Sequence, residues 1–424
     1  MNNNVIVVGQ GMAGLIAAIN LSLAGKKVSI LSMGKGVVAI GSSVVDFLGY
    51  VNKKRISDNP FNHLKELNSN HPYNIVGEDI IKESFSQFVE ILNKEGLEYK
   101  YNSDYTNRYA ISVMGTIKPT FITSEASDAS ILKDSKKVLF IGIEHIKDSQ
   151  PLLAVEQFKN SKIFPNREAG YAYIKNPIEN AHRVQNALDL SRYTDTDAGF
   201  HWLKSELLRV QEDYDTIILP PILGVSNFTK NYKELKRIGL NILECISMPP
   251  GVGGKRIEEA LLSYARSLNI TLVENCNVRR ANVEGNKCIS LMSNPGVHEG
   301  DRDTVFSASN YIIATGGVMG GGISSTPNDV YESIFNISID HSERVEDRAN
   351  QMFIGDHEFA KYGVSVNKDL KAINREENVI LNNVYFAGNT LAGYDFPTEK
   401  SGYGVAISTG YAAAKNLLNN LVGE

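Results

Sequence analysis

Three glycines near the N-terminus have the spacing of a turn that binds a nucleotide phosphate. The motif Gly9-Gln10-Gly11-Met12-Ala13-Gly14 stands between an apolar run and a stretch of helical periodicity. In such a turn the first glycine allows a sharp reversal, the second lets the backbone approach a phosphate, and the third lets helix and strand pack closely. The N–H groups and dipole of the helix N-terminus favour an anion. The motif therefore predicts a nucleotide site.

The elements that must position this turn form a β-α-β unit. Residues 5–9 are a short apolar strand, 13–24 have helical spacing, and 28–31 are a second strand. The chain has 424 residues, 42% of them hydrophobic, which is enough for two domains. The alternation of apolar strands and helices predicts an α/β fold.

Changes in composition indicate that one domain interrupts the other. Asn59-Pro60 and His71-Pro72 break a polar, Asn-rich stretch, and buried strands are predicted at 137–142 and 216–221. From residue 248 the helix and strand pattern of the first domain returns. The predicted nucleotide-binding domain comprises 1–58, 248–330 and 376–424, the inserted cap comprises 59–247, and 331–375 return to the cap.

Composition excludes several classes of protein. A net charge of −5 does not suit a nucleic-acid binder. Cys245, Cys276 and Cys288 are too few and too widely spaced for a disulfide framework, a zinc site or an iron–sulfur cluster, so no metal site is predicted. The first residues lack the features of a signal peptide, and no apolar run reaches the ~20 residues of a membrane span. We therefore expect a cytoplasmic protein.

Two later strands also end in turns of small residues. Residues 311–314 run into Thr315-Gly316-Gly317, and 384–387 run into Gly388-Asn389. Parallel strands of an open α/β sheet end at one edge, where ligands bind. We therefore expect both turns to lie beside the phosphate turn.

The last helix begins with two glycines, in Gly402-Tyr403-Gly404-Val405. Its N–H groups would suit the electron-rich edge of a reduced flavin. Gly41-Ser42-Ser43 is a small polar loop, suited either to a flavin phosphate or ring or to an ordinary turn. The predicted cofactor-binding residues are Gly9, Gly11, Met12, Ala13, Gly14, Ser32, Gly41, Ser42, Ser43, Thr315, Gly316, Gly388, Asn389, Gly402, Gly404 and Val405.

These motifs resemble those of the succinate dehydrogenase/fumarate reductase flavoprotein superfamily. The resemblance is carried by the glycine motif 9–14, by 314–317, and by 383–389 with the helix from Gly402 to Gly410. That superfamily places a cap between its flavin-binding halves. The resemblance therefore implies a Rossmann-like flavin-binding domain interrupted by an inserted mixed α/β cap domain.

A narrower resemblance covers nearly the whole chain. Residues 113–116, 248–256 and 392–395 are similar to the B-subunit family of anaerobic glycerol-3-phosphate dehydrogenases. The resemblance implies FMN, a small phosphorylated substrate, and flavoprotein and iron–sulfur partner subunits. One departure is the start of the last helix, 400–404, where the bacterial subunits are richer in glycine.

The identity of the cofactor depends on an acidic residue that is missing after the second strand. Dinucleotide-binding proteins use it to bind the adenosine ribose, but here Ser32 and Lys35 occupy this part of the chain. Lys35 could instead meet the 2′-phosphate of an NADP-type cofactor. The flavin could be FMN, which has no adenosine, or FAD held by Ser32 and backbone groups. We predict FMN, with FAD as the alternative.

Catalytic residues are less well defined. Oxidation of an alcohol by a flavin needs a base for the hydroxyl proton and cations for an anionic group. Arg256 starts a helix after a glycine-rich turn and is the predicted anion ligand, with a solvated surface arginine as the alternative. His357 is a candidate proton carrier or an exposed loop histidine. Lys400 is the third predicted catalytic residue, and Lys255 and Arg348 are further cationic candidates.

Two enzymatic functions stay open at this point. The first is a flavin-dependent oxidoreductase component of an anaerobic glycerol-3-phosphate dehydrogenase that passes electrons toward a quinone. It would lie at the inner face of the cell membrane only through a partner. The second is a stand-alone FAD-dependent reductase or dehydrogenase of the fumarate reductase type that acts on another small acid. A non-enzymatic alternative is a nucleotide-binding assembly protein.

Overall fold

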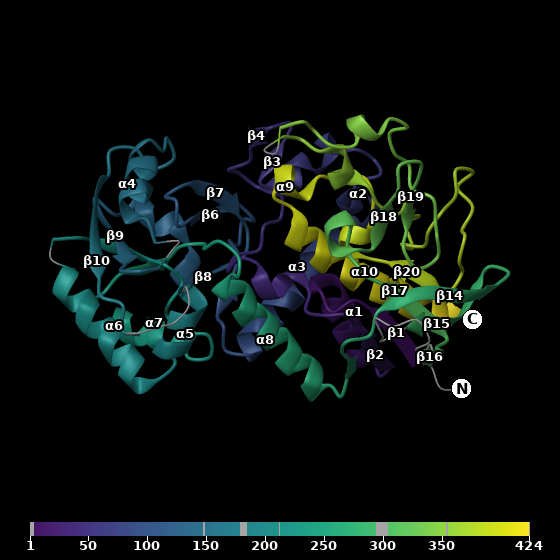
Figure 1. Cartoon of the computed structure of the whole chain (residues 1–424), viewed down its shortest axis with the longest axis horizontal. Helices are drawn as coiled ribbons and strands as arrows, with labels where there is room; N and C mark the ends of the chain where they lie inside the picture. Colours follow the sequence, from purple (N-terminus) through teal and green to yellow (C-terminus); the bar gives the residue numbers. More distant parts are fainter. Residues whose placement is uncertain are drawn as a thin grey trace.

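The computed structural model describes residues 4–146, 149–178, 185–211, 213–293, 304–352 and 355–423. Figure 1 shows two α/β bodies side by side, one around strands β1, β2, β17 and β20 and the other around β9 and β10. Within the described ranges, no helix is both long enough and apolar enough to cross a membrane.

The larger body is built on a five-stranded sheet with the strand order β13-β2-β1-β17-β20. Every neighbouring pair is parallel, so all five carboxyl ends lie at one edge. Val7 pairs with Ile30 on one side and Ile312 on the other, and all three side chains are buried. The strands are β1 (Asn4–Val8), β2 (Lys27–Leu31), β13 (Thr271–Val273), β17 (Asn310–Ile313) and β20 (Val384–Phe386).

Two helices from opposite ends of the chain pack against each other beside this sheet, α1 (Met12–Leu23) and α10 (Gly402–Gly423). Their backbones come close because Gly410 faces Ala13, where a Cβ would collide with the Ala13 carbonyl oxygen. Helix α3 (Glu78–Lys94) packs against α10 and α8 (Val252–Ser267). These contacts fix the N-termini of α1 and α10 beside the sheet edge.

The smaller body is the cap, with a parallel sheet in the order β10-β9-β11-β12. In Figure 1, α4 lies on one side of this sheet and α5 to α7 lie on the other. Part of its core is a separate cluster of buried residues between Ile111 and Cys245. The elements are β9 (Lys137–Ile143), α4 (Pro151–Lys159), β10 (Glu168–Ile174), α5 (Ala187–Thr194), α6 (Asp197–Val210), β11 (Thr216–Leu219), α7 (Phe228–Arg237) and β12 (Ile242–Glu244).

Short antiparallel ladders connect and flank the two bodies. Strands β14, β15 and β16 form one such sheet, and the others are two-stranded. The remaining elements are β3 (Tyr50–Val51), β4 (Lys54–Arg55), α2 (Pro72–Val76), β5 (Tyr99–Lys100), β6 (Arg108–Ile111), β7 (Ile117–Thr120), β8 (Thr123–Ser124), β14 (Val278–Glu284), β15 (Lys287–Ser293), β16 (Thr304–Phe306), β18 (Ile323–Ser325), β19 (Val330–Glu332) and α9 (Phe396–Glu399).

The predicted α/β class and both buried cap strands are confirmed, but two segments lie elsewhere than expected. Helices α2 and α3 contact α10, so they join the larger body although they fall within 59–247. Val364 bridges to Leu391, which follows β20, so this part of 331–375 also joins the larger body. We propose that the cap proper runs from β6 to β12.

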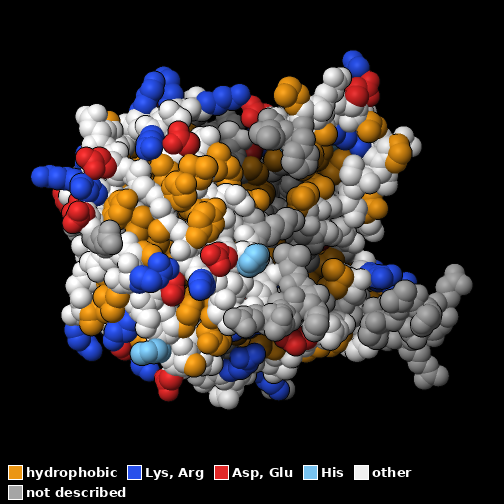
Figure 2. Space-filling model, turned by 60° about the vertical axis from the view of Figure 1, so that its left-hand side comes forward, with side chains coloured by type: hydrophobic (Ala, Val, Ile, Leu, Met, Phe, Trp, Pro, Cys, Tyr) orange, Lys and Arg blue, Asp and Glu red, His pale blue; other side chains and the backbone are white. Residues whose placement is uncertain are grey.

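The outer edge of the cap exposes large hydrophobic side chains. Leu152 and Leu153 on α4, and Tyr171 and Tyr173 on the edge strand β10, are 40–53% exposed. Figure 2, in which the cap side comes forward, shows hydrophobic side chains gathered in groups among charged ones. This face of the cap therefore carries exposed apolar groups between its charged side chains.

Candidate functional site

The phosphate turn has the geometry that its three glycines predict. Gly9 has φ +110°, a conformation that favours glycine, and a Cβ there would collide with the Ala314 carbonyl oxygen. A Cβ on Gly14 would collide with the Gly9 carbonyl. Gly11 is extended, and no described residue beyond its own chain neighbours and helix backbone lies within 4 Å of the position of its Cβ. The side of Gly11 where a phosphate would approach is therefore open.

Among the described residues, none caps the N-terminus of α1 with a side chain. The first turn of this helix has no acidic residue. The first backbone bond of the helix runs from the Leu15 N–H to the Gly11 carbonyl at 3.0 Å. The N–H groups of Met12, Ala13 and Gly14 therefore precede the first helical bond, as in an anion site.

The loop 36–43 lies across this turn and reaches two other helices. Gly36 packs on the backbone of Gly11, and Gly41 packs on the Tyr403 hydroxyl. The Gly41 carbonyl accepts the Gly254 N–H of α8 at 3.0 Å. The Tyr99 hydroxyl donates to the Ser43 carbonyl at 2.8 Å. The loop is thus held between α1, α8 and α10.

The two C-terminal turns meet α1 from the other side. The Gly316 N–H donates to the Thr390 hydroxyl at 3.2 Å, which joins the turns after β17 and β20. Gly388 faces the Ala13 side chain, and its N–H donates to Thr409 of α10 at 2.9 Å. The structure therefore brings these segments, distant in sequence, to one sheet edge.

A buried polar network holds the turn between α9 and α10. The His71 ring lies 3.1 Å from the Glu399 carboxylate, and the Ser401 hydroxyl donates to the same carboxylate at 2.9 Å. Burial would raise the pKa of Glu399, but the hydrogen bond and charge of His71 lower it below its usual value. The Gly404 N–H donates to the Asp46 carbonyl at 3.0 Å. The network holds the start of α10 in place.

Within the part of the chain that the structure describes, four buried polar atoms on these segments have no hydrogen-bond partner. They are Gln10 Nε2, Ser43 Oγ, Thr315 Oγ1 and the Tyr403 hydroxyl. Each such atom costs about 1–3 kcal/mol when it stays unpaired. A polar group bound among the turns would supply the missing partners, so the residues present fit a flavin nucleotide.

Gln10, in the phosphate turn, was not among the cofactor-binding residues predicted from the sequence. Its side chain is 3% exposed, and the Ser32 hydroxyl donates to its Oε1 at 3.0 Å. Ser32, predicted as a direct cofactor ligand, therefore orients Gln10. Lys35 is exposed. The signal that could have pointed to Gln10 is a polar residue at the variable second position of the glycine motif.

Arg256 does not have the free guanidinium that an anion ligand needs. It is 2% exposed and makes two hydrogen bonds to the Glu244 carboxylate, at 2.5 and 3.1 Å. Its Nε donates to the Gly224 carbonyl at 2.7 Å, and the guanidinium lies 3.9 Å from the Phe228 ring centroid. These partners bind the guanidinium through Nε, Nη1 and Nη2 and cover its face. Since they all belong to the cap, Arg256 joins α8 to the cap. This corrects its predicted role and the surface alternative.

Two other cationic candidates also have protein partners. Lys255 pairs with Glu258 at 2.7 Å. Arg348 is 5% exposed and donates to the Thr326 carbonyl at 2.7 Å and the Ser342 carbonyl at 3.0 Å. Both side chains therefore have structural roles.

The contacts described for His357 place it on its own loop. Its Nδ1 accepts the Asn350 N–H at 3.1 Å, and its ring lies 5.1 Å from that of Phe359. A role as a proton carrier stays a prediction.

Lys400 has the most distinctive surroundings of the catalytic candidates. It ends α9 in the left-handed conformation, φ +54°, with Ser401 between it and α10. Burial and the nearby charge of Lys118 lower the pKa of Lys400, while Asp46 and Asp395 oppose the shift. Strained backbone and a shifted pKa often coincide at functional sites.

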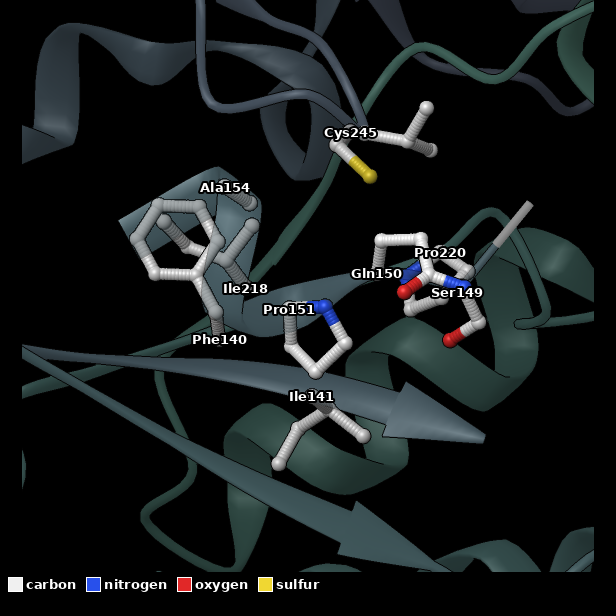
Figure 3. Close-up of a pocket in the computed structure, with 10 residues that line it drawn as sticks. Phe140, Ile141, Ser149, Gln150, Pro151, Ala154, Ile218, Pro220 and Cys245 are labelled. Atoms are coloured by element: carbon white, nitrogen blue, oxygen red, sulfur yellow. The ribbon is translucent and has the colours of Figure 1, made fainter. Parts of the chain in front are cut away.

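The cap has a small separate pocket at the carboxyl ends of β9 and β11 (Figure 3). The Cys245 sulfur points into it, and burial raises the pKa of that thiol. The Ser149 hydroxyl there accepts the Ile143 N–H at 2.7 Å. The lining residues are Val113, Phe140, Ile141, Ser149, Gln150, Pro151, Ala154, Ile218, Pro220 and Cys245. This pocket belongs to the cap core and is distinct from the glycine turns.

The sheet edge, its glycine turns and the unpaired buried atoms define a nucleotide-binding α/β protein of the flavoprotein type. The family described as FAD binding domain matches residues 4–405, and the chain belongs to this family. The predicted flavoprotein class is confirmed.

Relatives of nearly equal length support the narrower resemblance. The chain is 27% identical to the B subunit of anaerobic glycerol-3-phosphate dehydrogenase from Vibrio vulnificus, covering 99% of this chain and 97% of that protein. It is 27% identical to the probable B subunit from Halobacterium salinarum, with 97% of each covered. A solved structure, 3-ketosteroid delta1-dehydrogenase from Sterolibacterium denitrificans, matches 99% of this chain and 100% of that chain at 12% identity and TM-score 0.45. The predicted resemblance to the B subunits is confirmed.

Proposed function

We propose that this chain is the B subunit of an anaerobic glycerol-3-phosphate dehydrogenase, a flavin-dependent oxidoreductase that passes electrons toward a quinone. The observation that carries the proposal is the set of unpartnered buried polar atoms on four segments that meet at one sheet edge. Likeness to the B subunits over 99% of the chain supports the choice of substrate.

Different segments of the chain would have different roles in such a reaction. A bound flavin supplies the acceptor for a hydride. The N–H groups at the start of α1 would hold its phosphate, with Gln10 beside them. The start of α10 would face the electron-rich edge of the ring. Of the three catalytic residues predicted from sequence, Lys400 is the one that we place next to this edge of the ring.

The proposed function is tested by mixing the purified chain with glycerol-3-phosphate under anaerobic conditions. The expected result is loss of the visible flavin absorbance, with dihydroxyacetone phosphate formed in equal amount. Succinate and lactate are the comparison substrates. Reduction by one of these acids, with no response to glycerol-3-phosphate, would favour the stand-alone enzyme instead.

We also propose that the chain works with flavoprotein and iron–sulfur partner subunits. The relatives are named as one subunit of an enzyme, and the three described cysteines are buried and separate. The isolated chain is therefore expected to reduce an artificial dye but not a quinone, and co-expressed partners are expected to restore quinone reduction. Full quinone turnover by the chain alone would contradict this.

The flavin is expected to be FMN. The family is described by FAD, but the end of β2 offers no carboxylate for an adenosine ribose, and the Ser32 hydroxyl is bound to Gln10. A lost charge-assisted hydrogen bond costs ~1.5–3 kcal/mol, about tenfold or more in affinity. Heat release followed by chromatography identifies the cofactor, and a stoichiometric yield of FAD would overturn the prediction.

A further inference from the structure

Two lysines and an aspartate gather where the cap meets the start of α10. Lys118 lies on β7, Asp46 follows the loop 36–43, and Lys400 ends α9, with Ser401 between it and α10. The Lys118 ammonium and the Asp46 carboxylate form a close ion pair. The Asp46 carbonyl accepts the Gly404 N–H at 3.0 Å. The cluster therefore sits on the helix N-terminus that faces the candidate flavin site.

Two polar groups of this cluster have no hydrogen-bond partner among the described residues. In the described part of the chain, the half-buried Lys400 ammonium has no hydrogen bond or ion pair, and Asp46 Oδ1 is buried without a partner. Lys400 and Pro119, the residue after Lys118, both pack on Gly49, with Lys400 Cβ 3.0 Å and Pro119 Cγ 3.1 Å from the position of a Cβ there. At this separation the charge of Lys118 lowers the pKa of Lys400, so the two cations repel each other. Burying a cation without an anion is unfavourable. The nearby carboxylates do not bond to Lys400, because Asp46 is paired with Lys118 and Asp395 accepts the Thr398 N–H of α9 at 3.2 Å.

We propose that Lys118 and Lys400 together bind an anionic group of the substrate, a phosphate or a carboxylate, and that Asp46 holds Lys118 until this group arrives. The inference rests on the proposed function and adds a cap residue to it. A phosphate monoester has nearly two negative charges near neutral pH and several acceptor oxygens, which suits two ammonium groups. One lysine comes from each body, so the bound anion would also join the cap to the flavin side.

The other cations near the site cannot serve in this way. Arg256 is held by Glu244, Lys255 by Glu258, and Arg348 by backbone carbonyls. Lys118 differs from Arg256 because its partner is itself partly exposed, with the Asp46 side chain at 16%. It also differs from Lys255, which pairs with two carboxylates, Glu258 and Glu259. An incoming anion can therefore compete for Lys118.

The inference is tested on the flavin-loaded full chain, with inorganic phosphate and succinate as probes. Binding is read from the shift of the visible flavin spectrum, so the test does not depend on turnover or on the true substrate. Lys118→Met and Lys400→Met are each expected to weaken binding at least tenfold, and Lys118→Arg is expected to retain most of it. Lys236→Met, at a surface pair with Glu125, is the matched control and should change nothing.

Asp46→Asn gives the sharper test because the inference predicts a gain in anion affinity for this variant. It releases Lys118 from its partner, so the probe anion should bind severalfold more tightly. A purely structural pair would give no tighter binding. A response to phosphate identifies a phosphate site, and a response to succinate alone identifies a carboxylate site. The inference is overturned if the wild-type chain binds neither probe, or if Lys118→Met binds them normally with its flavin retained.

Discussion

Replacing Gly11 with leucine is expected to remove the flavin while the fold survives. Gly11 is extended, so its backbone accepts any residue, and among the described residues only its own chain neighbours and helix backbone lie within 4 Å of its Cβ position. The side chain would occupy the space in front of the N–H groups of α1. Loss of two charge-assisted hydrogen bonds lowers affinity about 100-fold. Flavin content per chain after gel filtration measures the effect.

Gly34→Leu is the matched control for this substitution. Gly34 also has open space around its Cβ position and no positive φ, but it stands in the loop beyond β2. It should keep its flavin. A Gly11→Leu chain that is folded and fully loaded would show that the phosphate does not bind at this turn.

Arg256→Ala is expected to lower the free energy of unfolding by about 3–5 kcal/mol. The substitution leaves the Glu244 carboxylate, itself fully buried, without its cation. Its remaining partner is the Leu223 N–H at 2.7 Å. Urea unfolding followed by circular dichroism measures the change.

Arg344→Ala provides the control for Arg256. Arg344 pairs with Glu346 at 2.7 Å, but its side chain is 70% exposed. Exposed pairs contribute about 0–1 kcal/mol, so a small change is expected. A stable Arg256→Ala chain with weakened substrate binding would instead restore the anion-binding role predicted from the sequence.

The gathering of the glycine turns at one sheet edge was predictable because its signals are local. Gly9, Gly11 and Gly14 each perform a geometric role within one strand-turn-helix unit, and the parallel strands before Thr315 and Gly388 had to end at the same edge. Local composition was sufficient for these positions.

Roles that depend on contacts between distant segments could not be predicted in the same way. Arg256 had the sequence context of an anion ligand, yet its partner Glu244 lies on the cap strand β12. Lys118 and Asp46 are 72 residues apart and belong to no motif. The sequence of 80–96 predicts a helix, which the structure forms at 78–94, but it does not state that this helix packs against α10.

A crystal structure of the purified, yellow protein tests the central claim most directly. We predict one flavin per chain, with a phosphate on the N–H groups of Met12 and Ala13, a ring at the start of α10, and partners for Gln10 Nε2, Ser43 Oγ and the Tyr403 hydroxyl. A flavin bound elsewhere in the chain, or a colourless protein with these atoms unpaired, would contradict the proposed site.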